Sequence, residues 1–416
     1  SMKLENNLDT DDIKGLVWRL AFPSMLAQFV SVLYSIVDRM YIGNIPEIGE
    51  AALAGVGVCG PIVTLVSSFA FLVAPLMSIR LGEKNERAAS QILANCFLML
   101  AVLSAVLTVA SLALRETLLW KFGAGEGTFG YAKEYITIYL MGTVFALMTT
   151  GMNQFIICQG FAKIGMKSVI LGAVTNIVLD PVFIFALDMG VKGAAIATVI
   201  SQVASCTYAL RFLFSDRIPI KITFRGYDWN VMKRVIQIGM TPFIIIAMDN
   251  VLIIALNTVI QRLGGPGQGD TLLTCTTIVQ SFMLVVTMPL GGITSGTQTI
   301  LGYNYGAKRP DRIWRAEKWI GGMALCFTTI MFLIAQLVPE IFVRLFTQNE
   351  EYIRLSVWAI RVYTLGVIPL AVQYTIVDGF TGMGISSVAM GLSMWRKTVF
   401  LVGVFLIPRF AGITNV

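Results

Sequence analysis

The sequence predicts an all-α, polytopic membrane protein built from two six-helix lobes that are related by pseudo-twofold symmetry. Three observations predict this fold class: the composition, the length of the apolar stretches and an internal repeat. The chain has 416 residues, of which 56% are hydrophobic and only 13% are charged, whereas a soluble domain carries about 25% charged residues. Its mean hydropathy is +0.76. A chain of this composition is expected to lie within a lipid bilayer.

Apolar stretches of about 20 residues match the roughly 30 Å hydrocarbon core of a bilayer. The first six stretches form an N-lobe over residues 1–214, the basic stretch 215–234 is a cytoplasmic linker, and the last five form a C-lobe over 235–416. The twelfth helix is expected to be missing from this chain. The eleven stretches are 16–43, 51–77, 92–115, 131–158, 165–187, 193–214, 235–262, 271–298, 317–343, 353–378 and 385–410.

The two halves of the chain repeat each other. The Gly-Phe pair that begins at Gly160 recurs at Gly379, a displacement of 219 (379 − 160 = 219). Internal repeats of this length are typical of transporters with two lobes around a central site. Six helices per half make the repeats parallel, so both lobes begin on the same side. The same displacement pairs Gln154 with Gln373 and Pro23 with Pro242.

One irregularity interrupts the repeat. The glycine loop at Gly82 matches the loop at Gly306 with a displacement of 224 (306 − 82 = 224), so the first half is short by five residues (224 − 219 = 5) before Gly82. We therefore expect a short gap in the second helix.

Basic residues gather in alternate loops, which sets the expected orientation. The net charge is +7, and the positive-inside rule places the N-terminus in the cytoplasm of a multi-pass protein of the inner or plasma membrane. The charge is therefore not a sign of nucleic-acid binding. The six cysteines lie singly in apolar stretches without the spacing of metal ligands, so we expect no cofactor and no cysteine metal site.

Asn176 and Asp180 stand four residues apart in the fifth stretch and therefore lie on one helix face. Pro181 follows and has no backbone N–H, so it leaves the carbonyl of Ile177 without its helical partner. A carboxylate inside a membrane costs roughly 2.5–3.5 kcal/mol, and it persists mainly where it has a function. We interpret this cluster of oxygens as a site for H⁺ or Na⁺; the alternative is a polar contact that only stabilises the proline kink.

Asp38, near the end of the first helix, is the expected partner of Asp180. The alternative is an interfacial ion pair with its neighbour Arg39. Tyr139 and Thr198 are expected to reach the same cavity as hydrogen-bond partners, although ordinary helix packing explains them equally well.

The second half contains candidates for another cation site, on the seventh and tenth helices. At the repeat displacement of 219, Asp180 corresponds to the apolar Val399, so the two lobes are chemically unequal. Polar contacts between helices are the alternative explanation for these residues. The candidates are Asp249, Asn250, Gln373 and Asp378.

Histidine is absent from the chain, so any proton coupling must use carboxylates. The coupling ion is therefore H⁺ or Na⁺, and the only metal expected is Na⁺ at Asp38, Asn176 and Asp180. The chain also has 20 methionines, and Met-rich surfaces adapt to varied ligands. The residues expected to line a substrate cavity are Gln154, Gln280, Met283 and Met288.

Several motifs together resemble the MATE (multidrug and toxic compound extrusion) transporters, and the resemblance covers essentially the whole chain. The first half carries Ser35-Ile-Val-Asp-Arg-Met-Tyr-Ile-Gly43 and Asn176-Ile-Val-Leu-Asp-Pro181, and the second half carries Gly302-Tyr-Asn-Tyr-Gly-Ala-Lys308. The resemblance implies a V-shaped bacterial exporter that exchanges H⁺ or Na⁺ for drugs and toxic, often cationic, amphipathic compounds.

The resemblance also assigns roles to residues. It implies that Asp38, Asn176 and Asp180 hold the coupling ion, with Thr198 and Tyr139 beside them. It further implies that the first helix bends at Pro23, and that a second acidic position falls at Asp249 or Asn250. The protein is expected to act as a monomer and not as an enzyme.

The main rival is a flippase of lipid-linked oligosaccharides. An anionic pyrophosphate cargo would need cationic side chains that converge on the central cavity. The four intramembrane candidates are Arg19, Arg361, Arg396 and Lys397.

Overall fold

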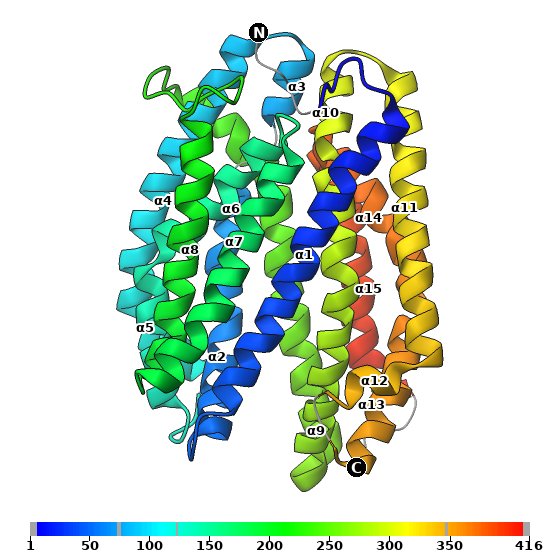
Figure 1. Cartoon of the computed structure of the whole chain (residues 1–416). Helices are drawn as coiled ribbons and strands as arrows, with labels where there is room; N and C mark the ends of the chain where they lie inside the picture. Colours follow the sequence, from blue (N-terminus) through cyan, green and yellow to red (C-terminus); the bar gives the residue numbers. More distant parts are fainter. Residues whose placement is uncertain (1–5, 73–75, 122–123, 346–347, 411–416) are drawn as a thin grey trace.

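A computed structural model describes residues 6–72, 76–121, 124–345 and 348–410 (Figure 1). Every regular element in these ranges is a helix, which confirms the predicted all-α class. In chain order the elements are α1 (Ile13–Gly43), α2 (Gly49–Ser68), η1 (Phe69–Leu72), α3 (Leu76–Gly82), α4 (Glu86–Lys121), α5 (Phe129–Met141), α6 (Thr143–Ile157), α7 (Ala162–Pro181), η2 (Val182–Ala186), α8 (Val191–Leu213), α9 (Trp229–Gly296), α10 (Gln298–Gly306), α11 (Pro310–Leu337), α12 (Pro339–Val343), α13 (Glu350–Tyr363), η3 (Thr364–Gly366), α14 (Val367–Gly382) and α15 (Ser386–Phe410).

Within the described ranges, nine helical segments are long and apolar enough to cross a membrane, and the bent pair α5–α6 makes a tenth. They match the first ten predicted stretches in order, and α15 occupies the eleventh. The prediction of a polytopic membrane protein is therefore confirmed.

Two of the predicted helices are interrupted. The stretch 131–158 is not one helix, because α5 and α6 meet at an angle of 56°. The bend falls at Gly142, where an added Cβ would lie 2.9 Å from a methyl carbon of Val199, so only glycine lets α8 pack this closely. The stretch 51–77 divides into α2, η1 and α3, and residues 73–75, next to the expected gap, lie outside the described residues.

Helix α9 must double back along its length, although its helical secondary structure is unbroken. Its 68 residues would extend about 100 Å if straight. Yet Asp249, in the first third of α9, contacts Lys397 of α15, and Thr294, near its last residue, contacts Asp378 of α14, while α14 and α15 pack on each other. The two arms, Trp229–Ile253 and the beginning of the span Ile278–Gly306, therefore correspond to the two helices that the sequence predicts here.

Helix α1 lies between the two lobes. Figure 1 shows α4 to α8 on one side, α10, α11, α14 and α15 on the other, and α1 running diagonally between them. The start of α1 packs into a core cluster with the second lobe, in which Leu16 and Leu20 meet Ile293 and Ile300. Gly296 of α9 faces Ser24 of α1, where an added Cβ would lie 2.3 Å from the serine oxygen. Small residues at helix crossings let membrane helices approach closely.

The lobes also meet at one end of the bundle, where α3 and α10 cross and where α1 begins (Figure 1). An added Cβ at Gly82 would lie 1.8 Å from the carbonyl oxygen of Tyr303, and one at Gly306 would lie 2.0 Å from the carbonyl oxygen of Ile79. The backbones of the two lobes are therefore in direct contact there. That end of the bundle is closed in this structure.

Candidate functional site

Asp38 of α1 and Asp180 of α7 come together inside the first lobe. Their carboxyl groups share a hydrogen bond, and only 8% and 1% of the two residues is exposed. Two carboxyl groups can hydrogen-bond to each other only if one of them is protonated. Arg39 points to the exposed surface and forms no ion pair with Asp38 among the described residues. The structure therefore favours the pairing of Asp38 with Asp180 over an interfacial ion pair.

Asn176 lies one helical turn before Asp180 and is fully buried. With its nitrogen directed at the carboxylate, its amide donates to both oxygens of Asp180 at 3.0 Å and accepts from the Tyr34 hydroxyl at 3.0 Å. Hydrogen-bond complementarity fixes this orientation of the amide. Thr198 Oγ1 of α8 lies 3.3 Å from the same amide. Three helices thus contribute to one polar cluster.

Small residues place α8 against α7 and so bring Thr198 to Asn176. An added Cβ at Gly172 would lie 2.3 Å from Ser205 Oγ, and one at Gly193 would lie 2.6 Å from the backbone of Phe183. Phe183 belongs to η2, the π-helical turn that follows Pro181. Proline removes a backbone donor, which favours such a change in helical hydrogen bonding.

Tyr139 also belongs to this region, where its hydroxyl accepts a hydrogen bond from Gln202 Nε2 at 3.4 Å. Its ring stacks on Tyr135, with centroids 6.2 Å apart. Tyr34, Tyr135 and Gln202 were not predicted as site residues from the sequence. Each stands four residues from a predicted one, namely Asp38, Tyr139 and Thr198, so the helical i, i+4 spacing was the available signal.

The oxygens of this cluster fit a small cation. Asp38 Oδ1 is buried without a hydrogen-bond partner among the described residues. Carboxylate, amide and hydroxyl oxygens are the ligands that hard cations prefer. A proton on the carboxyl pair or a Na⁺ ion among these oxygens would satisfy the unpartnered atom. The residues that would hold it are Asp38, Asp180, Asn176, Tyr34 and Thr198.

In the second lobe the candidate carboxylates have separate partners. Asp249 forms an ion pair with Lys397, whose side chain is only 3% exposed. Asp378 accepts a hydrogen bond from Thr294 Oγ1 at 2.5 Å. The structure therefore does not join Asp249 and Asp378 directly as one pair.

The neighbouring candidates Asn250 and Gln373 are held by the helix backbone. Asn250 Nδ2 donates to the carbonyl of Ile246 at 3.3 Å, and Gln373 Nε2 donates to the carbonyl of Leu392 at 3.4 Å. Glu317 of α11, which was not predicted from the sequence, lies against Gly379, where an added Cβ would be 2.8 Å from its Oε1. Glu317 was overlooked because it is the first residue of the predicted stretch 317–343, where a charged residue is not unusual.

The predicted substrate-lining residues do not form one surface. Gln154 lines a cavity of about 50 Å³ between α1, α6, α7 and α9, together with Gln28 and Ser295. Met283 instead packs against the core of the second lobe, and Met288 is 37% exposed. Gln280 Nε2 is buried without a hydrogen-bond partner among the described residues. Only Gln154 therefore faces the cavity between the lobes.

Three of the four cations that a flippase would need do not converge. Arg19 binds Asn6 and Asp11 at the end of the bundle where α1 begins. Arg361 donates to the carbonyl of Gln336 on an exposed surface, and Lys397 is paired with Asp249.

Comparison with known proteins identifies the class. A family model described as MatE matches residues 23–182 and 246–405, and the two matches are offset by 223 residues (246 − 23 = 223). This protein belongs to the MatE family.

Individual relatives agree with this assignment. The multidrug export protein MepA of Staphylococcus haemolyticus is 20% identical over 95% of this chain and 87% of its own length. An FAD transporter of Shewanella oneidensis is 22% identical over 84% of this chain and 78% of its own length. Among solved structures, the MATE multidrug transporter DinF-BH is 30% identical, with a TM-score of 0.89 over 99% of this chain and 92% of that one.

Proposed function

We propose that this protein exports amphipathic, often cationic, small molecules across a cell membrane in exchange for H⁺ or Na⁺. The observation that carries the proposal is the buried pair of Asp38 and Asp180, which share a hydrogen bond at the centre of a polar cluster. Its relatives include multidrug export proteins, which supports drug-like substrates. Because these relatives are transporters, we propose that this protein is also a transporter and not an enzyme. We further propose that it acts as a monomer.

Electrostatics explains why the pair binds one cation. Two negative charges about 4 Å apart repel each other by roughly 4 kcal/mol at an effective dielectric constant of 20. That repulsion corresponds to nearly a thousandfold preference for the state that holds one compensating charge. A proton, a Na⁺ ion or a cationic substrate can each supply that charge.

Exchange follows when the two lobes open on opposite sides of the membrane in turn. With the site open to the outside, H⁺ or Na⁺ neutralises the Asp38–Asp180 pair and weakens the attraction for a cationic substrate. With the site open to the cytoplasm, the ion leaves and the carboxylates attract the next substrate. A membrane potential of 100 mV supplies about 2.3 kcal/mol for each charge that moves inward.

The lipid-linked oligosaccharide flippase has no supporting geometry. Its anionic cargo would need Arg19, Arg361, Arg396 and Lys397 to meet in one cavity. Arg19, Arg361 and Lys397 instead have partners in three separate places.

The test is efflux of a fluorescent cationic dye from proteoliposomes under a pH gradient and a Na⁺ gradient, imposed separately. Asp180→Asn keeps the shape of the side chain and removes its charge, so we expect the ion to stimulate efflux about 5–150-fold less, the range of a 1–3 kcal/mol coupling. Asp188→Asn is the control, because it makes the same change at an exposed position eight residues further on. Unchanged ion-driven efflux in Asp180→Asn would refute the assigned site.

A further inference from the structure

We propose that the segment from Asn6 to Asp12, together with Lys84, Tyr303, Arg309 and Arg312, forms a clasp that locks the two lobes together at the end of the bundle where α1 begins. The clasp must open before that end can admit a substrate. The inference rests on the proposed function only in that transport requires both ends of the bundle to open in turn.

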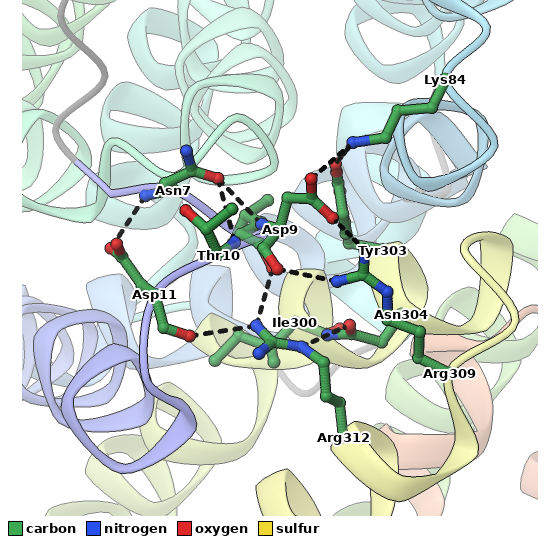
Figure 2. A network of polar contacts seen from close by, with 11 residues as sticks. Asn7, Asp9, Thr10, Asp11, Lys84, Ile300, Tyr303, Asn304, Arg309 and Arg312 are labelled. Atoms are coloured by element: carbon green, nitrogen blue, oxygen red, sulfur yellow. Dashed lines mark hydrogen bonds and ion pairs between the residues drawn. The ribbon is translucent and has the colours of Figure 1, made fainter.

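Asp9 is the centre of the clasp, as Figure 2 shows. Its Oδ2 forms an ion pair with Lys84 Nζ of the first lobe at 2.9 Å, and its Oδ1 forms an ion pair with Arg309 Nη2 of the second lobe at 2.6 Å. Arg309 Nη1 also donates to the backbone carbonyl of Asp9 at 2.7 Å. One carboxylate thus bridges the two lobes.

Further contacts of two side chains, Lys84 and Arg312, surround Asp9. Lys84 Nζ donates to the Tyr303 hydroxyl of α10 at 2.6 Å. Arg312 of α11 donates to the backbone carbonyls of Leu8 and Asp11, each at 3.1 Å, and to Asn304 Oδ1 at 2.9 Å (Figure 2). Because an Arg–backbone contact survives the neutralisation of Asp9, Arg312 holds the segment in place while the carboxylate forms the bridge.

The segment is also fastened to the first lobe. Asn6 Nδ2 donates to the carbonyl of Gly160 at 2.8 Å, and Arg19 donates to Asn6 Oδ1 at 2.7 Å and to Asp11 Oδ2 at 2.8 Å. Leu8 is 6% exposed and packs in the cluster that contains Tyr303. The segment is therefore a packed element with contacts to both lobes.

The chemistry of the clasp suits a contact that breaks and re-forms. The side chain of Lys84 is 61% exposed, and those of Asp9 and Arg309 are 25% and 38% exposed. Ion pairs at such a surface are individually weak and are screened by salt. Beneath them α3 and α10 touch backbone to backbone at Gly82 and Gly306, so releasing the clasp would allow the lobes to separate along that crossing.

The experiment measures the distance between the lobes by electron paramagnetic resonance on the full chain in lipid nanodiscs. Spin labels replace Lys163 of α7 and Lys318 of α11, both exposed, in a Cys326→Ser background, because the other five cysteines are buried. The protein with an intact clasp is expected to give one short distance. Asp9→Asn is expected to add a second, longer distance.

The matched control is Asp12→Asn, because Asp12 is an exposed acid in the same segment whose side chain makes no helix-capping hydrogen bond. It is expected to give the single short distance. If Asp9→Asn gives the same distribution as Asp12→Asn, the clasp is refuted. Should Asp9→Asn not be recovered as folded protein, Arg309→Gln, which breaks the same bridge from the other lobe, is judged by the same criterion.

A salt titration separates a clasp from a general structural role. Raising the ionic strength from about 0.01 M to about 1 M shortens the screening length from roughly 30 Å to roughly 3 Å. The fraction of molecules with the longer distance should therefore rise with salt in the parent protein. In Asp9→Asn this fraction should stay constant. A parent protein without salt dependence would contradict the inference. Since no transported compound is involved, a failure of ion-driven dye efflux leaves this result standing, and the reverse also holds.

Discussion

Replacing Asn176 with leucine tests how the polar cluster sets the affinity for the coupling ion. Asn176 is fully buried, and its amide donates to both oxygens of Asp180 at 3.0 Å and accepts from the Tyr34 hydroxyl at 3.0 Å. Leucine has the same branching and the same number of heavy atoms, and no polar atoms. The change therefore leaves the carboxylate and the hydroxyl without these partners inside the protein.

The size of the effect follows from these hydrogen bonds. A hydrogen bond to a charged group contributes about 1.5–3 kcal/mol. If about 2 kcal/mol of this holds the ionised carboxylate in the arrangement that binds Na⁺, the Na⁺ affinity falls roughly 30-fold, at 1.36 kcal/mol for each factor of ten. The Na⁺ concentration for half-maximal efflux would then rise by that factor. For H⁺ the effect has the opposite sign, because losing two donors to the ionised carboxylate favours its protonated form, so the half-maximal pH would move up by about 1.5 units.

The assay is dye efflux from proteoliposomes as a function of Na⁺ concentration or external pH. Asn95→Leu is the matched control, because Asn95 is also fully buried in the first lobe but binds the backbone of Gly226 at 3.1 Å. It should lower thermal stability without moving the half-maximal ion concentration. The reasoning is refuted if both variants leave the ion dependence where it is in the parent protein.

Two further predictions concern the other charged contacts. Asp249→Asn should lower the stability of the purified protein more than Lys397→Met. It leaves an uncompensated ammonium group with 3% exposure, at a cost of about 3–5 kcal/mol, whereas the carboxylate that Lys397→Met leaves is half exposed. Equal losses of melting temperature would contradict this. The clasp should be insensitive to pH between about 5 and 9. The hydrogen bond from Lys84 lowers the pKa of Asp9 below 3.8, so its contribution is lost only as the pH falls through that lowered value. The hydrogen bond to Tyr303 raises the pKa of Lys84 above 10.5, so its contribution is lost only as the pH rises through that raised value. The distance between labels at positions 163 and 318 should stay constant across this range, and a shift near neutral pH would count against the assignment.

The sequence predicted the elements that depend on local chemistry. The length of an apolar stretch is set by the thickness of a bilayer, so the spans emerged with small errors at their ends. The bend at Gly142 was missed, and the residue that packs against it, Val199, comes from another helix. For α9, the sequence predicted two separate apolar stretches but not the continuous helical segment that joins them.

The same division holds for the site. Asn176 and Asp180 share a helix face because of their spacing of four, so their proximity follows from the sequence. The partner of Asp249 is Lys397, which is 148 residues away, and no local pattern indicates it. The spacing of four residues from Asp38 was an available signal for Tyr34, but only the folded structure shows that its hydroxyl reaches Asn176.

By itself, the sequence determined that this is a membrane protein with carboxylates inside its apolar helices, because hydropathy and helical periodicity are properties of neighbouring residues. Only the tertiary structure decided which carboxylates meet and which end of the bundle is closed. Asp9 and Arg309 are 300 residues apart in the chain, and contacts at such separations depend on how the two lobes pack. That packing is fixed by glycine and serine surfaces, at Gly296 against Ser24 and at Gly82 against α10, whose complementarity no single stretch of sequence displays.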